Sequence, residues 1–133
     1  MKATIEESMQ ASAEALEVAR MLWENRERGR AAISRAFFSV FYATHAMLET
    51  KKLSASSHSG QIFLFNQHFI QPGILAKKFG TTLGRLFSKR LISDHELLTQ
   101  ITEQEVEDVL ADAQLFVEEI KNHLIFNHFW SEP

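Results

Sequence analysis

Arg90 and His95 stand five residues apart in the run Arg-Leu-Ile-Ser-Asp-His, and together they could act on a phosphodiester. The guanidinium of arginine is a planar cation that meets two phosphate oxygens at once. Imidazole gains and loses a proton near neutral pH, so it can act as a base or an acid. RNA supplies its own nucleophile, the ribose 2′-hydroxyl. Arg90 and His95 are therefore candidate catalytic residues for RNA cleavage without a metal.

Each member of this run also has a structural interpretation. Arg90 continues a predicted apolar stripe and should face a neighbour or a cleft, or else it caps its helix or pairs with an acid. His95 is either the proton-transfer group or a loop histidine without a task. Asp94 either orients an imidazole or pairs with Arg90, and pairing is favoured because adjacent residues rarely point the same way. The stripe that Arg90 continues comprises Leu75, Phe79, Leu83 and Leu86.

Three further polar residues share one side of the predicted helix 30–51: Arg35, Tyr42 and His45. They could complete a polar pocket, or they could be satisfied groups of the core or of an interface. The other histidines show no spacing typical of a metal site, and no His-Glu-x-x-His motif or aspartate cluster occurs. We therefore predict no metal and no cofactor.

The composition predicts one cytoplasmic domain that covers residues 1–133. Hydrophobic residues make up 45% of the 133 residues, which is enough for a core without disulfide or metal support. The chain has no cysteine, so disulfides, thiol nucleophiles and cysteine-bound zinc are excluded. We see no signal peptide and no apolar run near the roughly 20 residues of a membrane span.

Charge is distributed unevenly along the chain, although the net charge is only -3. Residues 29–95 carry nine basic and two acidic side chains, whereas residues 96–133 carry nine acidic side chains and one lysine. The positive middle is either a local anion site or the basic side of pairs formed within a bundle or across a dimer.

Helical periodicity covers nearly the whole chain and predicts an all-α, antiparallel up-down bundle of about five helices. Thr4 with Glu7, and Thr102 with Glu105, have the spacing of capping boxes. Gly29 predicts a stop or bend, and Gly80 with Gly84 predict a close approach of another backbone. The aromatic tail 126–130 could dock on the bundle or on a second subunit. The predicted helices span residues 4–28, 30–51, 58–69, 75–90 and 102–126.

An ordered set of motifs resembles the HEPN domain (higher eukaryotes and prokaryotes nucleotide-binding), in its small single-domain prokaryotic branch. These motifs are Ser34-Arg35-Ala36-Phe37-Phe38, then Phe41-Tyr42-Ala43, then His58-Ser59-Gly60, and then Arg90 before Asp94, with His95 where tyrosine is commonest. RNase members of this family carry an arginine, four to six residues, and a histidine, which Arg90 and His95 match. The chain departs from the family at Leu91, often polar in nucleases, and at Leu97, where some members have a tyrosine.

The resemblance implies two alternative functions. The first is a toxin-like, metal-independent endoribonuclease, paired with a minimal nucleotidyltransferase as antitoxin and often dimeric, with the Arg–His runs facing a shared cleft. The second is a non-catalytic homodimeric module that binds a nucleotide or regulates a nucleotidyltransferase. Both imply RNA or nucleotide as a partner, and neither implies a membrane.

Overall fold

The computed structural model describes residues 4–95 and 100–131, and the side chains of residues 4–91 and 100–131. Within these ranges it contains helices and no strand, so the predicted all-α fold is confirmed. The elements are α1 (Ile5–Trp23), α2 (Gly29–Glu49), α3 (His58–Phe65), η1 (Asn66–Ile70), α4 (Lys77–His95) and α5 (Glu103–Phe126). η1 is a single π-helical turn that continues α3.

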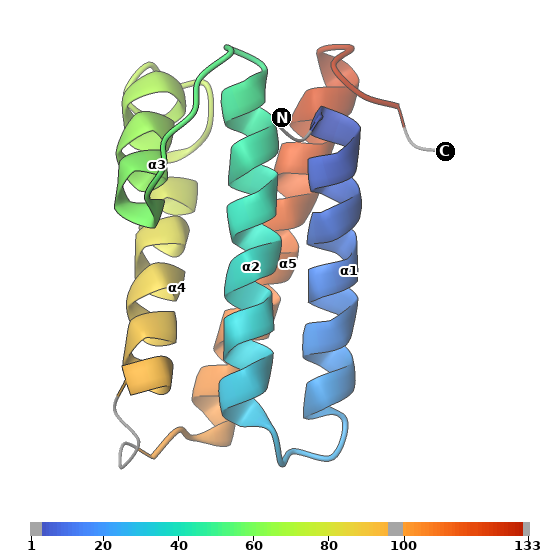
Figure 1. Ribbon diagram of the computed structural model, residues 1–133, viewed down its shortest axis with the longest axis vertical. Coiled ribbons are helices and arrows are strands. Elements are labelled where there is room, and N and C mark those ends of the chain that lie inside the picture. The colour runs from blue at the N-terminus through green and yellow to red at the C-terminus, as the bar shows by residue number, and fades with distance from the viewer. Residues whose placement is uncertain (1–3, 96–99, 132–133) are drawn as a thin grey trace.

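Helix α2 is the centre of the bundle (Figure 1). It packs against α1 on one side and against α3 and α4 on the other, while α5 lies behind it. Successive long helices run in opposite directions, and both ends of the described chain lie at the same end of the bundle. The antiparallel bundle of five helices is therefore confirmed, and it brings α2 and α4 side by side.

The helix starts follow from local hydrogen bonding. Thr4 and Glu7 form a complete capping box, in which each side chain accepts from the other's backbone N–H at 3.0 Å. The second predicted box is half formed: Thr102 accepts from the backbone N–H of Glu105 at 3.1 Å. The Glu105 carboxylate instead meets Lys89 of α4 at 3.4 Å, so it ties two helices together.

Several helix boundaries differ from the predictions, and α1 ends at Trp23, five residues before the predicted end at residue 28. Gly29 is the first residue of α2 and not a stop; a Cβ there would lie 3.0 Å from Val106 and 3.4 Å from Trp23, so the missing side chain lets three segments meet. Helix α4 continues to His95, whereas we predicted an end near Arg90.

The prediction for Gly80 and Gly84 is wrong in part. Gly80 faces a neighbouring element, but the nearest atoms belong to the side chains of Asn66 and Ile70 in the η1 turn and not to a backbone. Nothing lies within 4 Å of a Cβ built at Gly84. The two glycines therefore do not form one contact face.

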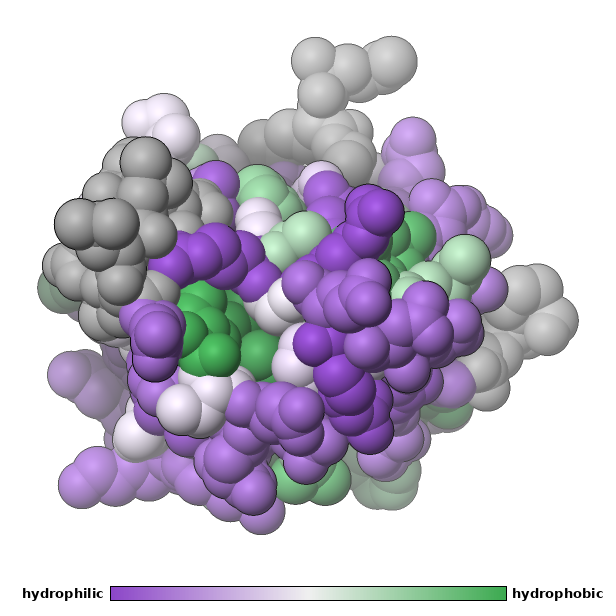
Figure 2. All heavy atoms as spheres, turned by 90° about the horizontal axis from the view of Figure 1, so that it is seen from below, coloured by the Kyte–Doolittle hydropathy of each residue, from purple (hydrophilic) through white to green (hydrophobic). Residues whose placement is uncertain are grey.

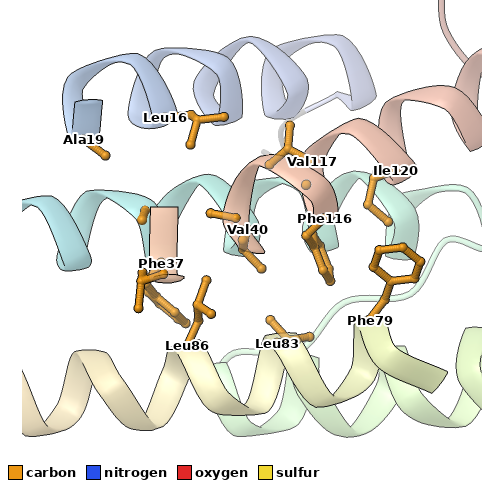
Figure 3. Packing of buried hydrophobic residues seen from close by; sticks show 14 of the residues in the cluster. Leu16, Ala19, Phe37, Val40, Phe79, Leu83, Leu86, Phe116, Val117 and Ile120 are labelled. Carbon is orange, nitrogen blue, oxygen red and sulfur yellow. The ribbon is translucent and has the colours of Figure 1, made fainter. Parts of the chain in front are cut away.

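The largest fully buried side chains of the core are phenylalanines. Phe37, Phe65, Phe69 and Phe116 are fully buried, and each such side chain contributes about 1.5–3 kcal/mol by leaving water. In Figure 3, Phe37 of α2 lies opposite Leu86 of α4, within the stripe that leads to Arg90. The whole predicted stripe of α4 is buried, which orients the helix and fixes the direction of its continuation.

The aromatic tail docks in part on the bundle. Trp130 packs against the core, while Phe126 is 82% exposed and Phe129 is 46% exposed. No helix in the described ranges is both long enough and apolar enough to cross a membrane.

Candidate active site

Arg90 lies on two aromatic rings of α2. Its guanidinium carbon is 4.8 Å from the centre of the Phe38 ring and 5.4 Å from that of the Phe37 ring. The cause is the periodicity of α4, because Arg90 continues the buried side of the helix that carries Leu83 and Leu86. A half-buried guanidinium on an aromatic ring gains a cation–π interaction and loses conformational freedom.

Phe38 is the ring on which several polar side chains converge. The Arg35 guanidinium lies 5.3 Å from its centre, and the Tyr42 ring lies 5.9 Å away. Residues 35, 38 and 42 are three and four apart, so they share one side of α2. The structure therefore brings Arg35, Tyr42 and Arg90 to one ring.

His45, the fourth residue of the predicted stripe, is used elsewhere. Its Nδ1 lies 2.9 Å from the Ser8 hydroxyl of α1. The bond joins α2 to α1, and His45 lies about 10.5 Å along α2 from Phe38, roughly two turns away. It is a link between two helices, and the aromatic contacts of Arg90 do not include it.

His58 also joins this group, although it was not among the predicted site residues. It is the first residue of α3, and its ring centre lies 4.3 Å from that of Phe41, 5.4 Å from Phe37 and 6.0 Å from Phe87. Burial lowers the pKa of His58 below 6.5, and the positive charge of Arg90 lowers it further. An imidazole and a guanidinium thus face the same rings. The signal in the sequence was the His58-Ser59-Gly60 motif, which is part of the resemblance to the HEPN domain.

The side chains of Asp94 and His95 lie outside the described residues, as does Leu97. The helical backbone nevertheless extends to residue 95. Positions 90 and 95 of a regular α-helix are about 140° apart around the axis and about 7.5 Å apart along it. Arg90 and His95 are therefore on different sides of one continuous helix, and no helix end lies between them.

Part of the positive charge of the middle segment is neutralised within the bundle. Arg85 pairs with Asp112, and Lys89 pairs with Glu105 at 3.4 Å, so two basic residues of α4 meet acidic residues of α5. These pairs are partly exposed and contribute little stability. The interpretation of the charge pattern as pairing within a bundle holds for these residues.

A separate recess opens at the end of the bundle where α2 and α5 begin. It has a volume of about 750 Å³ and mixed charge, with Arg26 held by Glu107 at 3.4 Å and by the Trp23 carbonyl at 3.0 Å. Figure 2 views this end, where hydrophilic side chains surround a small hydrophobic floor. None of the predicted site residues lines this recess.

We searched the described residues for groups of side chains that could bind a metal ion. Among the residues whose side chains are described, no group of three or more histidine, aspartate and glutamate residues could hold a metal ion. The chemistry available around Phe38 is that of cations, aromatic rings and one imidazole: anion binding, stacking and proton transfer.

Comparison with known proteins adds a family and several relatives. A family model described as HEPN domain matches residues 5–123. A protein of Thermotoga maritima named "UPF0332 protein" is 34% identical over 108 residues, which cover 81% of each chain. A protein of Methanocaldococcus jannaschii named "Putative toxin MJ0605" is 30% identical over 120 residues, covering 90% of this chain and 88% of the relative. A second protein of that organism, "Putative toxin MJ0142", is 27% identical over 124 residues, covering 93% and 84%.

Proposed function

Since the chain belongs to the HEPN domain family, we propose that it is a toxin-type endoribonuclease that cleaves RNA without a metal. The names of two relatives support a toxin-like role. The observation that carries the proposal is the contact of the Arg90 guanidinium with the Phe38 ring at 4.8 Å. A cation held in one orientation before substrate arrives can stabilise charge on phosphorus without reorganisation.

In this proposal the 2′-hydroxyl of the ribose attacks the adjacent phosphorus. The bond from the 2′-oxygen to phosphorus forms, the bond from phosphorus to the 5′-oxygen breaks, and the products are a 2′,3′-cyclic phosphate and a 5′-hydroxyl. Arg90 binds the non-bridging oxygens in a bidentate manner. His95 transfers a proton, and Arg35 adds positive charge on the same ring, 5.3 Å from its centre.

The proposed enzyme works as a homodimer. Because positions 90 and 95 are about 140° apart on one helix, a single copy of α4 presents them to different directions. Two copies whose α4 ends face one cleft could bring the arginine of one protomer to the histidine of the other. The HEPN family provides a precedent for such a shared cleft.

The proposed antitoxin is a minimal nucleotidyltransferase. A toxin must be held inactive in its own cell, and the names of two relatives, "Putative toxin MJ0605" and "Putative toxin MJ0142", support a partner with this task. Co-expression with a nucleotidyltransferase encoded beside it should give a stable complex and abolish RNA cleavage. If the two proteins neither associate nor change cleavage, this part of the proposal is wrong.

The test of the nuclease is incubation of purified protein with single-stranded RNA in excess EDTA. We expect cleavage by the parent chain, products that end in 2′,3′-cyclic phosphate, and loss of cleavage in Arg90→Gln and His95→Ala. Arg85→Gln is the matched control, because Arg85 lies on the same helix but pairs with Asp112. Equal cleavage by the parent chain and His95→Ala, or cleavage that requires a divalent ion, would contradict the proposal.

The second candidate is a non-catalytic module that binds nucleotide. The observation that favours it is the placement of two guanidinium groups, Arg35 and Arg90, on one aromatic ring, since phosphate and base could bind there without proton transfer. In this case the parent chain leaves RNA intact but binds nucleotide saturably, and Arg90→Gln abolishes the binding.

A further inference from the structure

We propose that His58 is a second proton-transfer residue of the Arg90 site and that it acts as the general base on the ribose 2′-hydroxyl. The inference rests on the proposed nuclease function and assigns a residue outside the Arg90–His95 run. Cleavage of RNA without a metal needs one group that accepts a proton and one that donates a proton. The Arg90–His95 run contains a single imidazole, so it leaves one of these roles open within a protomer.

The geometry places His58 and Arg90 on the same ring. The centre of the His58 imidazole and the guanidinium carbon of Arg90 are each 5.4 Å from the centre of Phe37. Both also contact Phe38, at 6.3 Å and 4.8 Å. A ribose attached to a phosphate that Arg90 binds would therefore lie close to the His58 ring.

The His58 ring is held by packing and not by a hydrogen bond to its nitrogen atoms. Its imidazole packs against Phe41 with ring centres 4.3 Å apart and remains half-exposed. Within the described part of the chain, no hydrogen bond to either ring nitrogen is present. The N-cap role at this helix start is filled by Ser57, whose hydroxyl accepts from the Gly60 N–H at 3.0 Å. Capping therefore does not explain a histidine here.

The charges around His58 favour the neutral imidazole. Among the side chains that the structure describes, the groups near it are the Phe37, Phe38 and Phe41 rings of α2 and the Phe87 ring and Arg90 guanidinium of α4. Burial and Arg90 both lower its pKa, and no carboxylate opposes them among these groups. A neutral imidazole near pH 7 can accept a proton at once, which suits a base rather than an acid.

In the proposed step, one bond to phosphorus forms and one breaks. A ring nitrogen of His58 takes the proton of the 2′-hydroxyl as the bond from the 2′-oxygen to phosphorus forms. His95 of the partner subunit gives its proton to the 5′-oxygen as the bond from phosphorus to that oxygen breaks. Arg90 stabilises the charge on the phosphorane oxygens. No oxidant, metal or second substrate takes part.

The first test is the substitution His58→Phe. It keeps an aromatic ring in the cluster that His58 forms with Phe37, Phe41 and Phe87, and it removes the nitrogen atoms. We expect the rate of RNA cleavage to fall by about 100-fold or more, with binding of a 2′-deoxy oligonucleotide and the unfolding midpoint retained. His68→Phe is the matched control, because His68 has a similar half-buried state but lies in η1 outside the cluster. Unchanged cleavage in His58→Phe would show that the ring has only a packing role.

A substrate with a sulfur atom in place of the 5′-bridging oxygen separates the base from the acid. Thiolate leaves without protonation, so this substrate should restore cleavage to His95→Ala but not to His58→Phe. Restoration of His58→Phe instead would overturn the assignment of His58 as the base. If the parent chain cleaves neither substrate, the nuclease function itself fails; if the parent cleaves and His58→Phe cleaves equally, only the role of His58 fails.

Discussion

The guanidinium of Arg90 lies 4.8 Å from the centre of the partly buried Phe38 ring, and this contact joins α4 to α2. The same ring carries Arg35 at 5.3 Å and Tyr42 at 5.9 Å. Residues that are 55 positions apart in the chain thus share one partner. The site is a product of the contact between two helices, and substitutions on either helix should affect it.

Arg90→Lys should abolish most RNA cleavage while leaving the fold intact. Lysine keeps the charge but loses the planar, bidentate donor set, so we expect the cleavage rate to fall by about 100-fold. The lost cation–π contact should lower the free energy of unfolding by no more than about 1–2 kcal/mol. Cleavage assays and denaturant unfolding measure the two effects, and Arg85→Lys should change neither by a comparable amount. A rate within about twofold of the parent would mean that Arg90 acts only as a point charge.

Phe38→Leu should reduce cleavage through the position of Arg90. Leucine keeps apolar volume but removes the ring on which two guanidinium groups rest, so both should lose their fixed orientation. Because misplacement of a catalytic group is costly, we expect a loss of about tenfold or more in rate, measured with RNA in EDTA. Phe63→Leu is the control, since Phe63 is 64% exposed and lies outside the cluster. The proposal for Phe38 fails if both variants cleave alike.

The free energy of unfolding should fall as the pH drops below about 6.5. Burial lowers the pKa of both His58 and His123 in the folded chain, with Arg90 adding to the effect at His58 and Glu119 opposing it at His123. The unfolded chain then binds protons more readily than the folded chain does. The contribution of these two histidines to the free energy of unfolding is therefore fully present above pH 6.5 and is lost as the pH falls through the lowered pKa values. Urea unfolding at pH 7.5 and pH 5.5 measures the difference.

His58→Phe should make this pH dependence smaller, because the variant cannot take up the proton at that position. The comparison is between the two pH values within each variant, so a change in overall stability does not disturb it. An identical loss of stability in His58→Phe and in the parent chain would contradict the assignment.

Gly84→Ala and Gly80→Ala should have opposite effects on stability. Nothing lies within 4 Å of a Cβ at Gly84, so alanine should stabilise α4 by about 1 kcal/mol through helix propensity. A Cβ at Gly80 would collide with the Asn66 side chain and lie 3.2 Å from Ile70. Overpacking costs about 1–3 kcal/mol, which outweighs the gain. Thermal unfolding of the two variants should shift the midpoint up for Gly84→Ala and down for Gly80→Ala; shifts of the same sign would be inconsistent with the packing.

The sequence by itself determined the helices and most of their faces. Apolar residues at intervals of three and four predicted the buried side of α4, and Thr4 with Glu7 predicted the start of α1, because both signals are local. The continuation of that stripe also predicted that Arg90 would face a neighbour, which the contact with Phe37 and Phe38 confirms. The motifs predicted the HEPN family, which the family match confirms.

The tertiary structure decided which residues gather around Arg90. Arg35, Tyr42 and His45 have similar spacing, yet two of them meet the Phe38 ring while His45 bonds to Ser8 of α1. His58 joins the cluster because the chain returns from the end of α2 and begins α3 beside it. Periodicity specifies the side of a helix on which a residue lies, but the partner on that side depends on the path of distant segments, and no local pattern contains it.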